Sequence, residues 1–299
     1  MIPWVLLAFT AALFFGTSKV LVRKAMDVNA FIMVLYTLLM APPVLLCALI
    51  ASGDLFMKHN YDLLTIAYLG LSGVLQLVVG RIFAYSSIKL IGASRASQLT
   101  GTQVIFATIM SVGILQEEIN LILVTGILAI FLGAVFISFS SPPGEIDGGI
   151  PAKRFSTGLS LGLLGGFTWG LSQLFAREGV RGFRSPIMSS FISYLFAIST
   201  LVVIMPFVSN REGLKLKLTQ TICLFGSGTL TVFAFLAHYM ALRLASIVTV
   251  NPIVSTSPLI TLIVSYLLIR NIEFIGKKVL FGAIAVVFGA AIIALLGYK

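Results

Sequence analysis

Few residues of this chain could do chemistry inside an apolar environment, and Arg81 is the most prominent. It is the one strong base well inside a long apolar stretch, and a guanidinium binds carboxylates and phosphates through paired hydrogen bonds. A charge at the centre of a membrane helix costs about 2.5–3.5 kcal/mol on insertion scales, so Arg81 should face a cavity or a partner. The alternative interpretation is that its helix ends earlier and that Arg81 extends to the lipid headgroups.

His238 is the one histidine within an apolar stretch. Its side chain could take up a proton near neutral pH and so couple proton movement to another event. A lone histidine on an apolar helix more often makes one local hydrogen bond. Both interpretations of His238 stay open at this point.

Uncharged polar side chains gather on the apolar stretches 96–115 and 247–268, and smaller groups lie near residues 76 and 170. A polar helix face can line a cavity, or it can form hydrogen bonds between helices worth about 0.6 kcal/mol each. We expect a shared cavity lining. Together with Arg81 and His238, the candidate substrate-binding residues are Gln76, Gln98, Thr102, Gln103, Trp169, Ser172, Gln173, Asn251, Ser255 and Thr256.

The acidic residues constrain the chemistry by their position, because all ten are expected outside the interiors of the apolar stretches. Without a carboxylate the interior is poorly suited to a cation, and neutral, zwitterionic or anionic ligands fit better. An intramembrane enzyme would need an acid or a nucleophile–base set at membrane depth. We therefore expect no enzyme activity, no metal site and no cofactor.

The composition shows what must position these residues. Of the 299 residues, 59% are hydrophobic and 10% are charged, whereas soluble domains carry about 25% charged residues. Runs of 18 or more apolar residues recur, and each can cross a hydrocarbon core of about 30 Å. The chain is thus an all-α, multi-pass protein of the cell membrane. Its net charge of +10 lies at helix ends against lipid headgroups, so nucleic acid is not an expected partner.

The apolar runs predict ten transmembrane helices. Their expected ranges are 2–17, 30–52, 63–88, 96–115, 120–139, 158–175, 186–208, 218–241, 247–268 and 279–296. Pro252 and Pro258 lie inside the ninth range, where each frees a backbone carbonyl one turn earlier and creates a hinge point. The segment 141–157 is rich in turn-forming residues, and we interpret it as the linker between residues 1–140 and 158–299.

These two parts match each other at a shift of 154 to 156 residues. Gly16 falls on Gly170, and an acid with two glycines also repeats: Glu117, Gly126 and Gly133 fall on Glu273, Gly282 and Gly289. Small residues at this spacing permit close helix packing, so we assign the glycines a structural role. Because each part has five spans, the second copy enters the membrane from the opposite side, which makes an inverted repeat.

The order of these motifs resembles a known family. Phe15-Gly16-Thr17-Ser18 and Trp169-Gly170-Leu171-Ser172, followed by glutamate-initiated, glycine-bearing helices, look like the drug/metabolite transporter superfamily of the EamA type. The resemblance covers almost the whole chain. It implies export or exchange of a small metabolite through a cavity lined by helices 1, 3, 4, 6, 8 and 9. It also implies cytoplasmic termini, whereas the distribution of Lys and Arg favours termini outside.

We therefore expect a secondary transporter that works by alternating access on a small neutral, zwitterionic or anionic metabolite such as an amino acid. A sugar or a phosphorylated or nucleotide-conjugated compound is the alternative substrate. A lipid-handling or structural membrane protein without a solute path is the alternative function. The expected partners are the substrate and the bilayer, and the expected assembly is a monomer.

Overall fold

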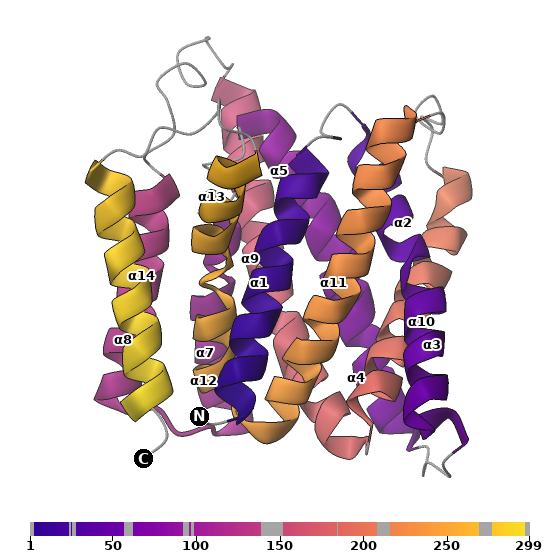
Figure 1. The fold of residues 1–299 in the computed structure, drawn as a ribbon, viewed down its shortest axis with the longest axis horizontal. Coiled ribbons are helices and arrows are strands. Elements are labelled where there is room, and N and C mark those ends of the chain that lie inside the picture. The colour runs from indigo at the N-terminus through magenta and orange to yellow at the C-terminus, as the bar shows by residue number, and fades with distance from the viewer. Residues whose placement is uncertain are drawn as a thin grey trace.

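The computed structural model is a bundle of helices packed side by side (Figure 1). It describes residues 3–23, 25, 28–56, 62–91, 96, 99–138, 152–183, 185–207, 216–268 and 277–296. The helices within these ranges are α1 (Pro3–Arg23), α2 (Ala30–Leu39), α3 (Ala41–Ser52), η1 (Asp54–Phe56), α4 (Leu63–Gly73), η2 (Val74–Val79), α5 (Gly80–Ile91), α7 (Gln103–Leu115), α8 (Leu121–Ser138), α9 (Ala152–Gly182), α10 (Pro186–Ile204), η4 (Met205–Phe207), α11 (Leu218–Leu244), α12 (Ile247–Val254), α13 (Ser257–Leu268) and α14 (Lys277–Leu296).

Within the described ranges, six stretches are long and apolar enough to cross a membrane. They are Pro3–Val22, Ala30–Ser52, Leu63–Ile91, Lys153–Gly182, Pro186–Ile204 and Leu218–Leu244. Four shorter apolar helices, Leu99–Leu115, Leu121–Gly133, Ile247–Thr261 and Ile284–Ile293, lie among them. The described part of the chain contains helices and no strands, which agrees with the all-α prediction. The total of ten spans stays a prediction.

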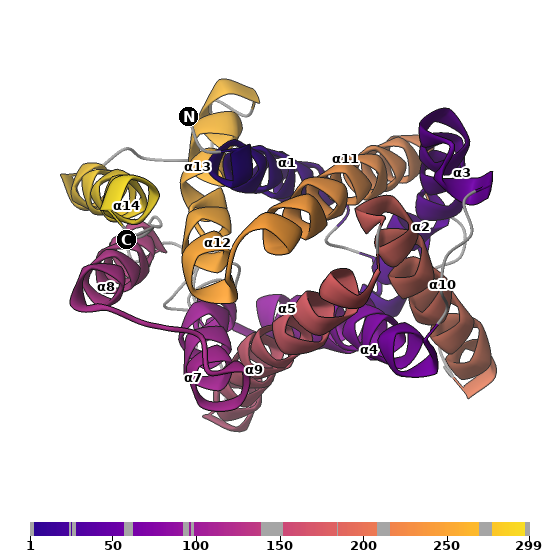
Figure 2. The same cartoon turned by 90° about the horizontal axis from the view of Figure 1, so that it is seen from below.

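The two parts of the chain interleave. Seen from below, α12, α13, α1 and α11 form one row, and α7, α9, α5 and α4 form a second row opposite it (Figure 2). Helix α1 of the first part packs on α11 and α13 of the second, while α9 of the second part packs on α5 and α7 of the first. The first helix of each part, α1 or α9, thus packs on helices of the other part in an equivalent way, which is the pattern of a pseudo-two-fold arrangement. The beginning of α1 and the end of α14 lie on the same face of the bundle, here called the terminus-bearing face (Figure 1).

Helices α8 and α14 form a seam at one end of the bundle, and glycines make it close (Figures 1 and 2). A Cβ added to Gly133 would lie 2.6 Å from the carbonyl oxygen of Gly282. A Cβ added to Gly289 would lie 2.6 Å from the carbonyl oxygen of Gly126. The glycines that match in the repeat thus oppose one another crosswise, so the two helices run antiparallel with backbones in contact.

Two of the predicted spans are broken by proline. The predicted span 30–52 consists of α2 and α3, which meet at Met40 directly before Ala41-Pro42-Pro43. The predicted span 247–268 likewise contains two helices. It consists of α12 and α13, separated by Ser255 and Thr256 between Pro252 and Pro258. Proline has no N–H to donate and clashes with the preceding turn, so the helical hydrogen bonds stop at these points.

The third span contains a π-helical segment. Its α-helical first part, α4, passes into η2, where the N–H of Gly80 bonds to the carbonyl oxygen of Leu75, five residues earlier. The helix then continues as α5 to Ile91 and not to residue 88 as predicted. Such segments are rare and frequently occur at functional sites, because they rotate the following side chains. Arg81 is the second residue after this segment.

Helix α9 is longer than the predicted range 158–175 at both ends. Its start at Ala152 includes the last six residues of the predicted linker 141–157, whereas residues 139–151 lie outside the described part. Its end at Gly182 includes Glu178, so one acid that we expected outside the spans lies in a helix. The polar residues at both helix ends were interpreted as loop, although helix ends in the headgroup region tolerate them. Helix α1 likewise extends past residue 17 to Arg23, so Lys19 lies inside it.

Candidate functional site

Arg81 lies inside the bundle, with 8% of its surface exposed. Its Nη1 donates to Thr37 Oγ1 of α2 at 3.1 Å, and Thr37 in turn donates to the carbonyl oxygen of Val34. The hydroxyls of Tyr85 and Tyr194 lie near enough for the guanidinium charge to act on them. All of these neighbours are neutral. Among the described residues, no carboxylate forms an ion pair with Arg81.

Aromatic rings continue from Arg81 into the bundle. Tyr194 of α10 packs edge-on against Phe235 of α11 with ring centroids 5.7 Å apart. Phe235 also contacts Phe15 of α1 at 5.3 Å and Tyr239 at 5.9 Å. The rings thus form a wall across three helices beside Arg81, here called the aromatic wall and made of Phe15 of α1, Tyr194 of α10, and Phe235 and Tyr239 of α11. Edge-to-face contacts of this kind fix ring positions.

The hydroxyl of Tyr239 ties the aromatic wall to two other helices. It lies 3.3 Å from Ser72 Oγ of α4 and 3.1 Å from Ser193 Oγ of α10. Ser193 Oγ also donates to the carbonyl oxygen of Leu69 at 2.9 Å. Because all three side chains are fully buried or nearly so, this network satisfies polar groups that would otherwise be unpaired in the core.

His238 lies three residues after Phe235 on α11 and is 2% exposed. Its Nε2 lies 3.1 Å from Oδ1 of Asn251 on α12, so the structure brings together two residues predicted for the site. The imidazole ring also packs edge-on against Phe15 and Tyr239. Nδ1 is buried and has no hydrogen-bond partner in the structure.

Gln76, Trp169 and Gln173 lie along the contact between the π-helical segment and α9. The indole Nε1 of Trp169 donates to the carbonyl oxygen of Gln76 at 3.1 Å, and the ring lies against Gly80. The side-chain oxygens of Gln76 and Gln173 are buried without a partner. Trp169 therefore fixes the segment that precedes Arg81, and two amide groups beside it are available to a ligand.

Several predicted site residues make local hydrogen bonds within their own chain segment. Thr102 and Thr256 each bond to a backbone carbonyl three residues earlier, at 2.5 and 2.8 Å. Ser172 does the same with the carbonyl oxygen of Trp169 at 2.7 Å. Gln103 and Ser255 are half-buried, with no side-chain hydrogen bond among the described contacts. Gln98 lies outside the described residues.

Gly16 and Gly170 occupy equivalent positions in the two parts of the chain. Gly16 of α1 contacts Ile260 and the carbonyl oxygen of Ser257 on α13, whereas Gly170 of α9 contacts Phe106 on α7. In both cases an added Cβ would lie 2.7–2.8 Å from an atom of the facing helix. Lys19, one turn after Gly16, is exposed and donates to Ser257 Oγ at 3.1 Å.

The terminus-bearing end of the bundle is closed by an ion pair and an apolar cluster. Glu117, between α7 and α8, lies 3.6 Å from Nε of Arg177 on α9, and both side chains are nearly buried. Its carboxylate also accepts from the backbone N–H groups of Ile247 and Val248, at 3.1 and 3.2 Å. These are the first two residues of α12, so the acid caps that helix.

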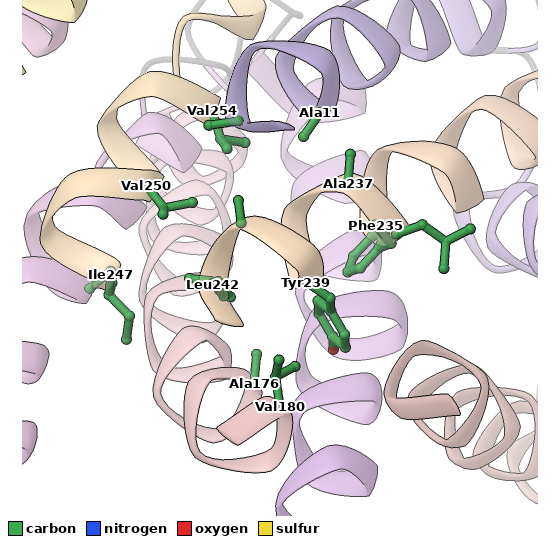
Figure 3. Close-up of a cluster of buried hydrophobic side chains, with 14 of the residues drawn as sticks. Ala11, Ala176, Val180, Phe235, Ala237, Tyr239, Leu242, Ile247, Val250 and Val254 are labelled. Carbon is green, nitrogen blue, oxygen red and sulfur yellow. The ribbon is translucent and has the colours of Figure 1, made fainter. Parts of the chain in front are cut away.

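Apolar side chains pack directly behind this ion pair. Figure 3 shows Ala176 and Val180 of α9, Leu242 of α11, and Ile247 and Val250 of α12 around one buried cluster. Every residue of α12 is buried. The described side chains at the terminus-bearing end are therefore buried against one another, whereas Lys19 near the opposite end is exposed.

The sequence interpretation missed the partners of the site and the closure at its end. Glu117 matches Glu273 in the repeat, and Arg177 likewise matches Arg23, but the sequence pattern did not pair Glu117 with Arg177. The basic residue recurs at a shift of 154 residues and the acid at a shift of 156, which marks both positions but does not reveal that they pair. Thr37 carried no comparable signal, since it lies alone in an apolar helix.

Comparisons with known proteins agree with this architecture. The chain matches the EamA-like transporter family twice, over residues 2–139 and 156–295, which correspond to the two parts described above. An uncharacterized transporter from Archaeoglobus fulgidus is 25% identical over 266 residues, covering 87% of each chain. A solved crystal structure of a protein with 15% sequence identity shares the fold, with a TM-score of 0.79 over 98% of each chain. The chain belongs to the EamA-like transporter family and is a multi-pass membrane transporter of small solutes.

Proposed function

We propose that this protein transports a small metabolite that carries a carboxylate or phosphate group, and that Arg81 binds this group. The single observation that supports the proposal is a buried guanidinium with neutral neighbours. A buried charge is costly unless an opposite charge compensates it. A substrate anion would supply that charge.

The setting of Arg81 also favours a ligand. The guanidinium has five N–H donors, whereas Thr37 supplies one oxygen acceptor at hydrogen-bond distance. Tyr194 Oη lies beside Arg81 but makes no hydrogen bond of normal geometry. The guanidinium of Arg81 and the hydroxyl of Tyr194 can therefore form hydrogen bonds with a substrate without losing strong contacts. Trp169 holds the π-helical segment before Arg81, which keeps the guanidinium in position.

The proposed mechanism is alternating access, in which the two parts of the chain rock around a site near the membrane midplane. Three observations support it: the repeat, the crosswise contacts between its halves, and closure of the path at one end. A symmetric partner state would be closed at the other end and open at the terminus-bearing face. Export or exchange would then follow the substrate gradient.

Replacing Arg81 with glutamine tests the anchor, because glutamine keeps a polar side chain and removes the charge. Purified protein should be reconstituted in proteoliposomes and assayed for counterflow of amino acids, organic acids and phosphorylated metabolites. The wild type should exchange at least one anionic or zwitterionic compound. Arg81→Gln should lose at least about tenfold in binding, since hydrogen bonds to charged groups contribute about 1.5–3 kcal/mol.

Arg243→Gln is the matched control, because Arg243 is a basic residue of α11 that is exposed to the surroundings. It should transport like the wild type. Unchanged transport by a folded Arg81→Gln protein would contradict the proposal. Exchange of neutral sugars but of no anion by the wild type would contradict it as well.

A further inference from the structure

We infer that the substrate also carries a hydrogen-bond donor, an N–H or O–H group, and that Nδ1 of His238 accepts from it. This inference rests on the proposed function, since it assigns a second contact in the same site. It begins from a buried polar atom that the fold leaves unsatisfied. Nδ1 of His238 has no hydrogen-bond partner, although the ring is 2% exposed.

The contact with Asn251 determines which ring nitrogen is available. Oδ1 of Asn251 is a carbonyl oxygen and can only accept, so Nε2 of His238 carries the proton. In a neutral imidazole the other nitrogen, Nδ1, is then an acceptor. Asn251 itself is held on α12, which is buried along its whole length. The contact with Asn251, which α12 holds in place, thus leaves Nδ1 of His238 as the acceptor.

The position of His238 relates this acceptor to Arg81. His238 follows Phe235 by three residues, so both side chains lie on one face of α11. Phe235 contacts Tyr194, the tyrosine beside Arg81, and Phe15 contacts both Phe235 and His238. The aromatic wall therefore has a cationic donor group at one end and an unsatisfied acceptor at the other. A ligand along this wall would pair its anion with Arg81 and its donor with His238.

The helices that cover His238 belong to different parts of the chain. Phe15, whose ring lies 6.5 Å from the imidazole, is on α1 of the first part, whereas His238 and Tyr239 are on α11 of the second. A rocking motion between the parts would change the contact between α1 and α11. Nδ1, sealed in this conformation, would become accessible to the substrate during that motion.

The inference is tested with pairs of compounds that carry the same anionic group. Only one member of each pair also carries a hydrogen-bond donor. Suitable pairs are alanine with propionate, 4-aminobutyrate with butyrate, and glycerol 3-phosphate with propyl phosphate. Binding to the purified full-length protein is measured by thermal shift and by inhibition of counterflow. The wild type should bind the donor-bearing member of at least one pair about tenfold more tightly, which is the scale of one good hydrogen bond.

Variants of His238 and of Arg81 distinguish the contact with the donor group from the contact with the anion. His238→Gln keeps an N–H that can reach Asn251 but lacks an acceptor at the Nδ1 position, so the preference for the donor-bearing member should fall to about twofold or less. His238→Asn places an oxygen near that position and should retain part of the preference. Arg81→Gln should instead weaken both members of a pair together.

Asn251→Leu provides a second route if His238→Gln does not fold. It leaves the imidazole in place but frees its proton to move to Nδ1, so the preference should again decrease. Equal binding of both members by the wild type would overturn the inference while leaving the anion anchor intact. An unchanged preference in folded His238→Gln would also overturn it. Binding of no anion at all would overturn the proposed function together with this inference.

Discussion

Two arginines lie buried in the part of the chain that the structure describes, and their surroundings differ in one decisive respect. Arg177 has Glu117 at 3.6 Å, whereas no described carboxylate pairs with Arg81. A buried ion pair within the chain is part of its structure, and removing one partner leaves an uncompensated charge. Arg81 has no such partner among the described residues, which is why we propose that a substrate anion compensates its charge.

Tyr239 illustrates a buried polar residue that we assign to structure. Tyr239→Phe removes the hydroxyl that joins Ser72 and Ser193 but keeps the ring in the aromatic wall. Hydrogen bonds within membrane proteins contribute about 0.6 kcal/mol each, so a loss on the order of 1 kcal/mol in stability is expected, with transport retained. Thermal unfolding in detergent and a transport assay measure the two effects.

The matched control for this variant is Tyr68→Phe, since the hydroxyl of Tyr68 makes no hydrogen bond to a described residue and its ring packs on Phe175. This substitution should leave the unfolding temperature unchanged. Complete loss of transport in a stable Tyr239→Phe protein would instead place the hydroxyl in the substrate path.

At the residue scale, the sequence identified the buried polar side chains more reliably than it identified their hydrogen-bond partners. Arg81 and His238 stand out because charge and imidazole are rare in apolar stretches. Thr102 and Thr256 are predicted to line a cavity, and each donates to a backbone carbonyl three residues earlier. A threonine hydroxyl can always reach a carbonyl three or four residues earlier, so its type and spacing alone do not reveal where it points.

At the element scale, the seam between α8 and α14 has the most specific requirement for side-chain size. An added methyl group at Gly133 would meet the carbonyl oxygen of Gly282 and Val286 within 2.6–2.7 Å. Two backbones in contact cannot move apart without losing the packing along the whole helix. The glycines therefore act through steric fit, which the repeated sequence pattern already suggested.

Gly133→Ala should destabilise the protein by about 1–3 kcal/mol, the usual cost of excess volume in a packed interior. Gly113→Ala in α7 is the matched control, because an added Cβ there would have no atom within 4 Å. It should be neutral or slightly stabilising, since alanine favours helix more than glycine does. The unfolding temperatures of the Gly133→Ala and Gly113→Ala proteins test this prediction. Equal temperatures would show that the seam tolerates separation.

The sequence predicted where helices occur more reliably than where they break or end. Apolar length identified the regions of α1, α10 and α14, since a membrane requires about 20 apolar residues in a row. The π-helical segment before Arg81 left no recognisable mark, because it depends on how α9 and Trp169 pack against it. The ends of α9 were missed because polar residues there continue the helix into the headgroup region.

At the scale of the whole molecule, the closure at one end determines which conformation the structure represents. Glu117 joins the first part of the chain to α9 and α12 of the second through an ion pair and two backbone hydrogen bonds. The path is therefore closed at the terminus-bearing face. Under the proposed alternating-access mechanism, opening to that face would separate Glu117 from these partners, so the contact would stabilise the closed state.

Weakening this contact should shift the population towards the state open at the terminus-bearing face. Glu117→Gln can still accept from α12 but loses the ion pair with Arg177. The population shift is measured as the accessibility of a single introduced cysteine, in a variant whose native Cys47 and Cys223 are replaced. A cysteine at Val250, which is fully buried in α12, should react slowly with a water-soluble maleimide, whereas one at Lys19 should react quickly.

Adding Glu117→Gln should raise the labelling rate at position 250 by at least roughly tenfold, because a tenfold shift between two states needs only about 1.4 kcal/mol. The rate at position 19 should fall in the same variant if the two ends open alternately. A rise at both positions would indicate local unfolding, and Glu178→Gln, which removes an exposed acid of α9, controls for the charge change. An unchanged rate at position 250 would mean that the apolar cluster alone closes this end and that Glu117 only caps α12.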